Sequence, residues 1–151
     1  MSRKDKRSVV RVVPRPTEKI ARTPAEIRTV EEAAFRWKVT LEYIELGNKE
    51  WGWQELTIQQ FFHILEKHLH RFESTSWRDL HTCKHCHPLS AGKIEKAAKA
   101  LLRTKHPGIE TLYGLSIGGH ARIWGYRAND VFYLMWHDPN HTVYKPSGYK
   151  G

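Results

Sequence analysis

The feature that most constrains the fold is an alternation of apolar and polar side chains on both sides of Asn129 and Asp130. Period-two alternation is typical of a β-strand, and two such runs separated by two turn-forming residues predict an antiparallel hairpin. We expect strands over about 120–128 and 131–138, with Ala128 opposite Val131. A longer loop is the alternative, and it would change every pairing beyond the turn.

The two-residue turn determines which side chains share a face of the predicted hairpin. Each step away from the turn pairs the next two residues, so that Arg122 lies opposite His137, and opposed side chains point to the same face. One face then carries Arg122, Trp124, Tyr126, Tyr133, Met135 and His137. The other face, which we interpret as the core face, carries Ile123, Phe132, Leu134 and Trp136. Arg127 belongs to the core face near the turn, where its side chain can reach solvent.

The sequence before the hairpin predicts a strand and then a helix. Odd positions over 35–43 are apolar and the even positions from 36 to 42 are polar, which indicates a half-buried first strand. Apolar residues at 3.6-residue spacing predict an amphipathic helix over about 58–72. Thr57 and Gln60 have the spacing of a capping box, so the helix is expected to begin there.

Further elements complete the predicted architecture. Ser76 is expected to cap a short helical turn, residues 81–88 are interpreted as a loop, and Ser90 is expected to cap a second helix to about residue 105. The predicted strands that follow are 111–117, 120–128, 131–138 and a short one at 142–145. The order predicts an α+β fold, in which a small antiparallel sheet has two helices packed on one face.

Composition limits the class of protein. The chain has 151 residues, of which 40% are hydrophobic, enough for one domain with a real core. No apolar run is long enough to span a bilayer, and no signal-peptide core stands at the start. Two cysteines argue against a secreted disulfide scaffold. We therefore expect a cytoplasmic protein without a membrane partner.

The net charge of +9 suggests a polyanionic partner. Residues 1–30 hold nine lysines or arginines against three acidic residues, together with three prolines and no aromatic residue. This composition predicts a flexible basic arm that lies along nucleic-acid phosphates, with a solvated tail as the alternative. The predicted organisation is thus an arm over 1–30 and an α+β domain over 31–151.

Cysteines and histidines raise the question of a metal. Cys83 and Cys86 have the spacing of a zinc-binding pair, and His137 and His141 supply a second pair with finger-like spacing. The two pairs stand about 50 residues apart and further histidines compete, so this site is only an alternative. A redox-active pair of thiols is another. We expect no metal and no other cofactor.

The end of the chain carries a set of residues suited to RNA cleavage without a metal. Such cleavage needs a base for the ribose 2′-hydroxyl, cations for the phosphorane and an acid for the leaving 5′-oxygen. The candidate catalytic residues are His87, Arg122, His141, Tyr144 and Lys145. The candidate substrate-binding residues are His85, Trp124, Tyr126, Arg127 and His137. The alternative for Asp138, followed by Pro139 and Asn140, is an ordinary turn in which Asp138 bonds local backbone amides.

Three motifs resemble known proteins. They are Trp51-Gly52-Trp53, His85-Cys86-His87, and the final run from Trp136 to Tyr144, which follows I-W-G-Y-R on the preceding strand. Over about 35–145 the pattern resembles the RelE/ParE-like toxin superfamily. More narrowly, it is similar to a group of prophage and actinobacterial proteins that end in W-D-P-x-H-x-V-Y. His137 departs from that group, which has a second tryptophan there.

The resemblance implies an activity. RelE-like members are ribosome-dependent mRNA endonucleases, whose sheet carries the groups that position and cleave mRNA. By this resemblance, Arg122 matches their strand arginine, while His141, Tyr144 and Lys145 match their C-terminal positions. The expected function is metal-independent transesterification of mRNA at the ribosome, restrained by an acidic antitoxin. The alternative is a non-catalytic nucleic-acid- or protein-binding module of phage or prophage origin.

Overall fold

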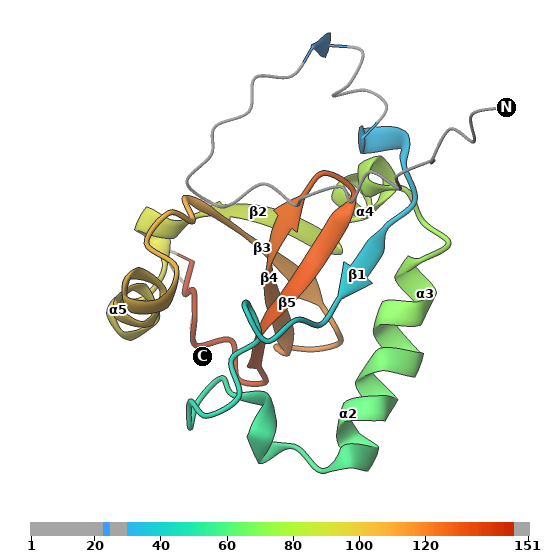
Figure 1. The fold of residues 1–151 in the computed structure, drawn as a ribbon. Helices are drawn as coiled ribbons and strands as arrows, with labels where there is room; N and C mark the ends of the chain where they lie inside the picture. The colour runs from blue at the N-terminus through green and yellow to red at the C-terminus, as the bar shows by residue number, and fades with distance from the viewer. Residues whose placement is uncertain (1–22, 25–29, 147–151) are drawn as a thin grey trace, which may run out of the picture.

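The computed structural model describes residues 23–24 and 30–146, so that the predicted basic arm lies almost wholly outside the described residues. These form an α+β fold around one mixed sheet with the strand order β1-β5-β4-β3-β2 (Figure 1). The strands are β1 (Arg36–Lys38), β2 (Cys86–Ser90), β3 (Thr111–Ser116), β4 (Arg122–Ala128) and β5 (Val131–Asp138). Because β1 runs parallel to β5, the expectation of a purely antiparallel sheet is wrong.

The helices cover both faces of the sheet. The first helical rod comprises α2 (Ile58–Ile64), a π-helical stretch (Leu65–Leu69) and α3 (His70–Phe72). It lies on one side of the sheet with α4 (Trp77–Thr82), whereas α5 (Lys96–Lys105) lies on the other side (Figure 1). The prediction that both helices pack on one face is therefore wrong. The amphipathic pattern shows which side of a helix is apolar, but not which face of the sheet it covers.

The start signals of the helices are largely confirmed. The Thr57 hydroxyl accepts from the Gln60 amide while the Gln60 side chain accepts from the Thr57 amide, which completes the predicted capping box. Ser76 caps α4 as expected. Ser90 caps only a short 3-10 turn (Ala91–Lys93), and α5 begins separately after Glu95. The second predicted helix is therefore two elements, because the backbone is extended at Ile94 and Glu95.

Two expected segments differ from the prediction. The segment 81–88, expected as a loop, contains the end of α4 and the start of β2. The short strand expected at 142–145 is absent from the described part of the chain, since the Thr142 and Val143 amides bond to the Asp138 side chain instead. A further 3-10 turn (Trp53–Glu55) precedes α2.

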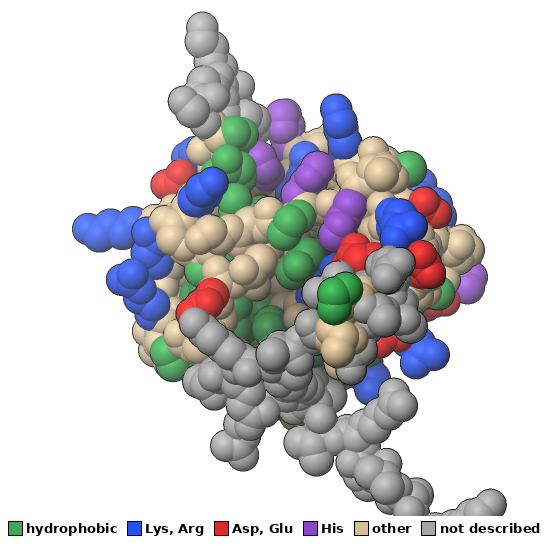
Figure 2. All heavy atoms as spheres, turned by 90° about the horizontal axis from the view of Figure 1, so that it is seen from above, with side chains coloured by type: hydrophobic (Ala, Val, Ile, Leu, Met, Phe, Trp, Pro, Cys, Tyr) green, Lys and Arg blue, Asp and Glu red, His purple; other side chains and the backbone are tan. Residues whose placement is uncertain are grey.

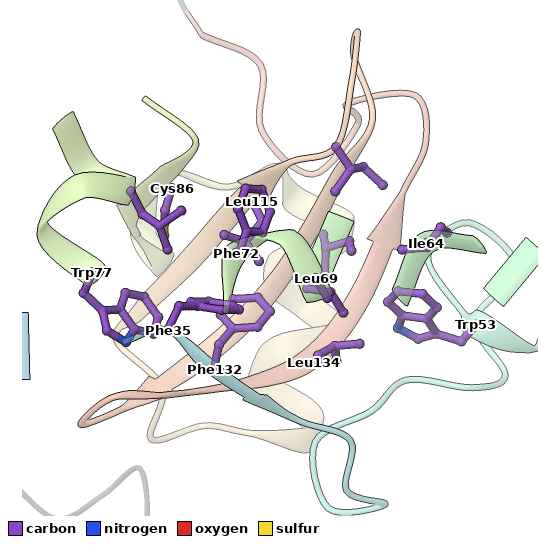
Figure 3. Packing of buried hydrophobic residues seen from close by; sticks show 13 residues of the cluster. Phe35, Trp53, Ile64, Leu69, Phe72, Trp77, Cys86, Leu115, Phe132 and Leu134 are labelled. Carbon is purple, nitrogen blue, oxygen red and sulfur yellow. The ribbon is translucent and has the colours of Figure 1, made fainter. Parts of the chain in front are cut away.

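Each face of the sheet has its own apolar core. The core beneath α2, α3 and α4 includes Phe35, Phe72 and Phe132, which pack side by side in Figure 3. The core beneath α5 includes Leu102, Trp124 and Met135. Burying a side chain of this size contributes about 1.5–3 kcal/mol, so both layers stabilise the fold. The hairpin face of Trp124 and Met135, which the sequence did not assign to the core, is consequently covered as well.

A β-bulge changes the register of the hairpin. The two-residue turn is confirmed, since Ala128 lies opposite Val131. Beyond Gly125 the pairing shifts, and Arg122 lies opposite Asp138 rather than His137. The extra residue is Met135, whose carbonyl accepts from the Glu45 amide (2.9 Å) and the Trp53 indole (3.2 Å).

The shift moves the end of β5 to the opposite face. Trp136 and Asp138 join the face of Trp124 and Arg122, while His137 joins the face of Ile123. The predicted pairing of Arg122 with His137 is therefore wrong. The prediction that Trp136 shares a face with Ile123 is also wrong. Gly125 permits this geometry, because a Cβ at this position would collide with the Phe132 ring and the Tyr133 carbonyl oxygen.

Candidate functional site

A buried carboxylate anchors the end of the chain. Asp138 is fully buried, and one of its oxygens accepts from the Thr142 amide (2.8 Å) and the Thr142 hydroxyl (3.2 Å). The other oxygen accepts from the Trp124 indole (3.1 Å) and the Val143 amide (3.0 Å). Four donors thus satisfy this carboxylate, which confirms the interpretation of Asp138 as a turn residue.

Trp51, from the Trp51-Gly52-Trp53 segment, contacts the same turn. The Trp51 indole donates to the Thr142 hydroxyl (2.8 Å), and its ring stacks on Trp136 with 5.7 Å between the centroids. His141, inside the turn, has a positive φ of 56°. Such a backbone conformation is uncommon outside glycine and persists where the surroundings hold it. These contacts hold His141 next to the ends of β4 and β5.

Arg122 brings a positive charge to this end of the sheet. Its side chain is half-buried, and its Nη1 donates to the carbonyls of Gly119 and Ala121, each at 2.9 Å. No carboxylate in the described part of the chain forms an ion pair with it, and the neighbouring Asp138 carboxylate is bound by other donors. The guanidinium therefore has no direct ion pair within the described residues, although the Asp138 carboxylate stands on the neighbouring strand.

Arg122, His141 and Tyr144 form what we name the C-terminal cluster. Burial lowers the pKa of His141, and the nearby charge of Arg122 lowers it further, while Asp138 opposes the shift. The ring is therefore neutral at pH 7, the form that accepts a proton. The Tyr144 ring meets it edge-on, with 6.5 Å between the centroids. Lys145 follows on the surface.

His120 also belongs near this cluster, although the sequence did not single it out. It lies exposed in the turn between β3 and β4 and contributes to the lowered pKa of His141. The signal that was present is its position two residues before Arg122, directly after Gly118 and Gly119. Both glycines have a positive φ, so the chain turns sharply there.

Arg127 lies at the other end of β4 and has a different environment. Its Nη2 pairs with Glu31 at 2.7 Å, and its guanidinium lies 3.9 Å from the ring centroid of Trp77. Only 8% of the side chain is exposed, so the expectation that it reaches solvent is wrong. Its Nε also donates to the Asn129 carbonyl.

A histidine completes this second group, which we name the Glu31 cluster: Glu31, Trp77, His81, Tyr113 and Arg127. His81 approaches Glu31 at 3.6 Å and stacks on Tyr113 with 6.2 Å between the centroids. Burial lowers the pKa of His81. Figure 2, which looks onto the end of the molecule where α4 and β2 lie in Figure 1, shows histidines beside basic and acidic side chains.

Both predicted histidines of the 85–87 segment are exposed. His87 is exposed, bonds the Lys84 carbonyl (2.7 Å), and is close enough to His81 to affect its pKa. His85 is also exposed, and its carbonyl accepts from Ser116, the β3 residue opposite Arg122. Two strand spacings, about 10 Å, thus separate the backbones of His85 and Arg122.

The remaining predicted substrate-binding residues are packed side chains. Trp124 is 3% exposed beneath α5, which leaves no ring face for a nucleic-acid base. Tyr126 is half-buried between Tyr43 and Tyr133. His137 lies 5.3 Å from the ring of Trp53, and burial lowers its pKa.

The cysteines do not gather with other ligands. Within residues 23–24 and 30–146, no group of three or more histidine, cysteine or acidic side chains is placed to hold a metal ion. Cys83 is exposed, whereas Cys86 is buried and burial raises the pKa of its thiol to about 12. A thiol with so high a pKa is a poor ligand and a poor nucleophile.

In the part of the chain that the structure describes, no helix combines the length and the apolar run that crossing a bilayer requires. No protein-family model, curated protein or solved structure matches this chain.

Proposed function

We propose that the protein is a toxin-type endoribonuclease that cleaves mRNA at the ribosome by metal-independent transesterification. The observation that carries the proposal is an arginine without an ion pair in the described residues beside a neutral histidine, Arg122 and His141, at one end of the sheet. A cation binds and stabilises a phosphate, and a neutral imidazole takes a proton. The RelE-like resemblance assigns these two positions to the same chemistry.

The chemistry follows from the C-terminal cluster. His141 takes the proton of the ribose 2′-hydroxyl, and the 2′-oxygen then bonds to the adjacent phosphorus. Arg122 donates to the phosphate oxygens, on which negative charge increases in the transition state. Tyr144 donates a proton to the leaving 5′-oxygen as the phosphorus–oxygen bond breaks. The products are a 2′,3′-cyclic phosphate and a 5′-hydroxyl, with Lys145 adding a cation on the surface.

The proposed partners of the protein are an RNA substrate and an inhibitor protein. The substrate is mRNA on the ribosome, so the proposed location is the cytoplasm. The excess of basic residues favours both the RNA and a protein inhibitor of opposite charge. We propose that an acidic antitoxin binds the protein, because an unrestrained ribonuclease harms its host.

Expression in a bacterial host tests the proposal. The parent chain is expected to arrest growth, whereas the Arg122→Ala/His141→Ala double variant is expected to permit it. Arg78→Ala is the control, since this exposed arginine lies outside the cluster and its ion pair within the described residues is with exposed Glu32. Equal arrest by the parent and the double variant, at equal levels of folded protein, would contradict catalysis at this cluster.

One observation favours a second function, a non-catalytic nucleic-acid-binding module. His141 is only 9% exposed, which restricts the approach of a ribose to its ring. In that case the protein binds RNA through Arg122 and other basic residues without cleaving it. Incubating labelled RNA with the purified protein separates the two functions, since a binding module retards the RNA in a gel and leaves its length unchanged.

A further inference from the structure

A cavity lies between α5 and the turn after β2, and no residue of the C-terminal cluster lines it. Its volume of about 400 Å³ is within the range of small-molecule sites. Ser90, at its rim, lies opposite Thr111 at the start of β3, whereas Arg122 lies opposite Ser116 at the other end of that strand. Five residues of β-strand correspond to about 17 Å, so the cavity is separate from Arg122.

Two basic side chains line the cavity from one helix. Lys99 and Arg103 are four residues apart on α5 and therefore lie on the same helix face. The Lys99 ammonium donates to the Gly92 carbonyl (2.9 Å), which holds it across the cavity toward the turn. Neither side chain forms an ion pair with a residue that the structure describes. Two such cations in a concave surface attract an anion.

Neutral hydrogen-bonding groups stand beside the two cations. His106 lines the cavity and stacks on Tyr43 with 5.4 Å between the centroids. Burial lowers the pKa of His106, so that at neutral pH its ring offers one donor and one acceptor. The Ser90 oxygen accepts from the Gly92 amide (3.3 Å), and its hydroxyl proton can still be donated.

The other residues that line the cavity indicate which groups the ligand carries besides its anion. Glu110 also lines the cavity and already has a partner in the protein, and its carboxylate oxygens can accept further hydrogen bonds from sugar hydroxyls. Leu102 and Ile109 are buried side chains that supply an apolar wall. A ligand that fits has a phosphate at one end, hydroxyls near the carboxylate, and a size well above that of inorganic phosphate.

We propose that this cavity binds a phosphorylated, hydroxyl-bearing ligand of mononucleotide size, with its phosphate on Lys99 and Arg103 and its sugar hydroxyls toward Glu110. The source is either a free nucleotide or one nucleotide of an RNA strand, since both present the same chemistry. This site goes beyond the proposed ribonuclease activity and does not depend on it, because no residue of the C-terminal cluster lines the cavity.

Titration of the full chain with adenosine 5′-monophosphate tests the site, followed by calorimetry or by amide chemical shifts. We expect binding in the range of ~1 mM or tighter, and a loss of at least about tenfold for Lys99→Ala/Arg103→Ala. The matched control is Lys93→Ala/Lys96→Ala, which removes the same charge from exposed residues that do not line the cavity. The control is expected to bind like the parent.

Adenosine, inorganic phosphate and a short RNA show which part of the nucleotide the cavity binds. Adenosine alone is expected not to bind, and inorganic phosphate is expected to bind more weakly than the nucleotide. Competition by a three-nucleotide RNA would identify the strand as the source, and its absence a free nucleotide. The proposal is overturned by absent nucleotide binding, by equal affinity of the two double variants, or by equal affinity for phosphate and nucleotide. Arg122→Ala is expected to leave this affinity unchanged, which separates the result from that of the ribonuclease test.

Discussion

The two arginines of β4 each lie near a histidine and a tyrosine, but they have different roles. Arg122 begins the strand beside His141 and Tyr144, and Arg127 lies near its end beside His81 and Tyr113. Arg127 is paired with a carboxylate and covers an indole ring, whereas Arg122 bonds only backbone carbonyls in the described structure. The residue types are the same at both sites, so charge compensation distinguishes the structural arginine from the candidate functional one.

The largest expected effect is on RNA cleavage by Arg122→Ala. Removing one group that stabilises transition-state charge slows a reaction by about 100- to 1,000-fold. The melting temperature is expected to change little, since within the described residues this side chain bonds two carbonyls of a turn and no other group. Rate and melting curve are measured on the same preparation. A fall in both, in proportion, would give Arg122 the structural role assigned to Arg127.

A second large effect is expected for the carboxylate near Arg122. Asp138→Ala leaves four donors without their acceptor, and each unsatisfied buried donor costs about 1–3 kcal/mol before water reaches it. We expect a loss of about 3 kcal/mol in the free energy of unfolding, measured with urea. Glu31→Ala is the counterpart at the other arginine. Equal small losses in the two variants would remove the contrast between these carboxylates.

A smaller loss of stability is expected for Arg127→Met. The substitution keeps the apolar contact with Trp77 but removes a desolvated cation–π interaction and the pair with Glu31. We expect about 2 kcal/mol less stability, with little direct effect on cleavage by the folded protein. A double-mutant cycle with Glu31→Gln measures the part due to the ion pair. Additive effects in that cycle would mean that the pair contributes nothing.

The smallest expected effect is on titration. Burial lowers the pKa of both His81 and His141, so each binds a proton less readily when folded than when unfolded. Their contribution to stability is present above the unfolded pKa of about 6.5 and is lost as the pH falls toward the folded pKa. The free energy of unfolding is therefore expected to decrease from pH 7 to pH 5.

Nuclear magnetic resonance of the imidazoles sharpens this prediction. Because Arg122 lowers the pKa of His141 and Arg127 lowers that of His81, each arginine variant is expected to raise the pKa of its own histidine. The other histidine serves as the internal control in each variant. Two histidines that respond alike to either substitution would contradict separate clusters.

Local features of the sequence predicted local structure. The turn at Asn129 and Asp130, the capping box at Thr57, and the turn at Asp138 are each determined by neighbouring residues, and the structure confirms them. The alternation of apolar and polar residues alone does not predict the β-bulge. Its carbonyl, at Met135, bonds the Trp53 indole from 82 residues earlier.

In the candidate site, too, residues near the hairpin in sequence were predicted and distant partners were not. Arg122 and His141 lie close in sequence to the hairpin and were identified with it. Arg127 was misplaced because Glu31, its ion-pair partner, stands 96 residues away in the chain. The face of β5 beyond the bulge was misassigned because an extra residue reverses the alternation of side chains.

Cleavage of ribosome-bound mRNA by purified protein tests the central claim most directly. The parent is expected to produce fragments that end in a 2′,3′-cyclic phosphate. Arg122→Ala and His141→Ala, each shown to be folded by circular dichroism, are expected to produce at least about 100-fold fewer. Intact mRNA with the parent, or undiminished cleavage by both folded variants, would contradict a catalytic role for the C-terminal cluster.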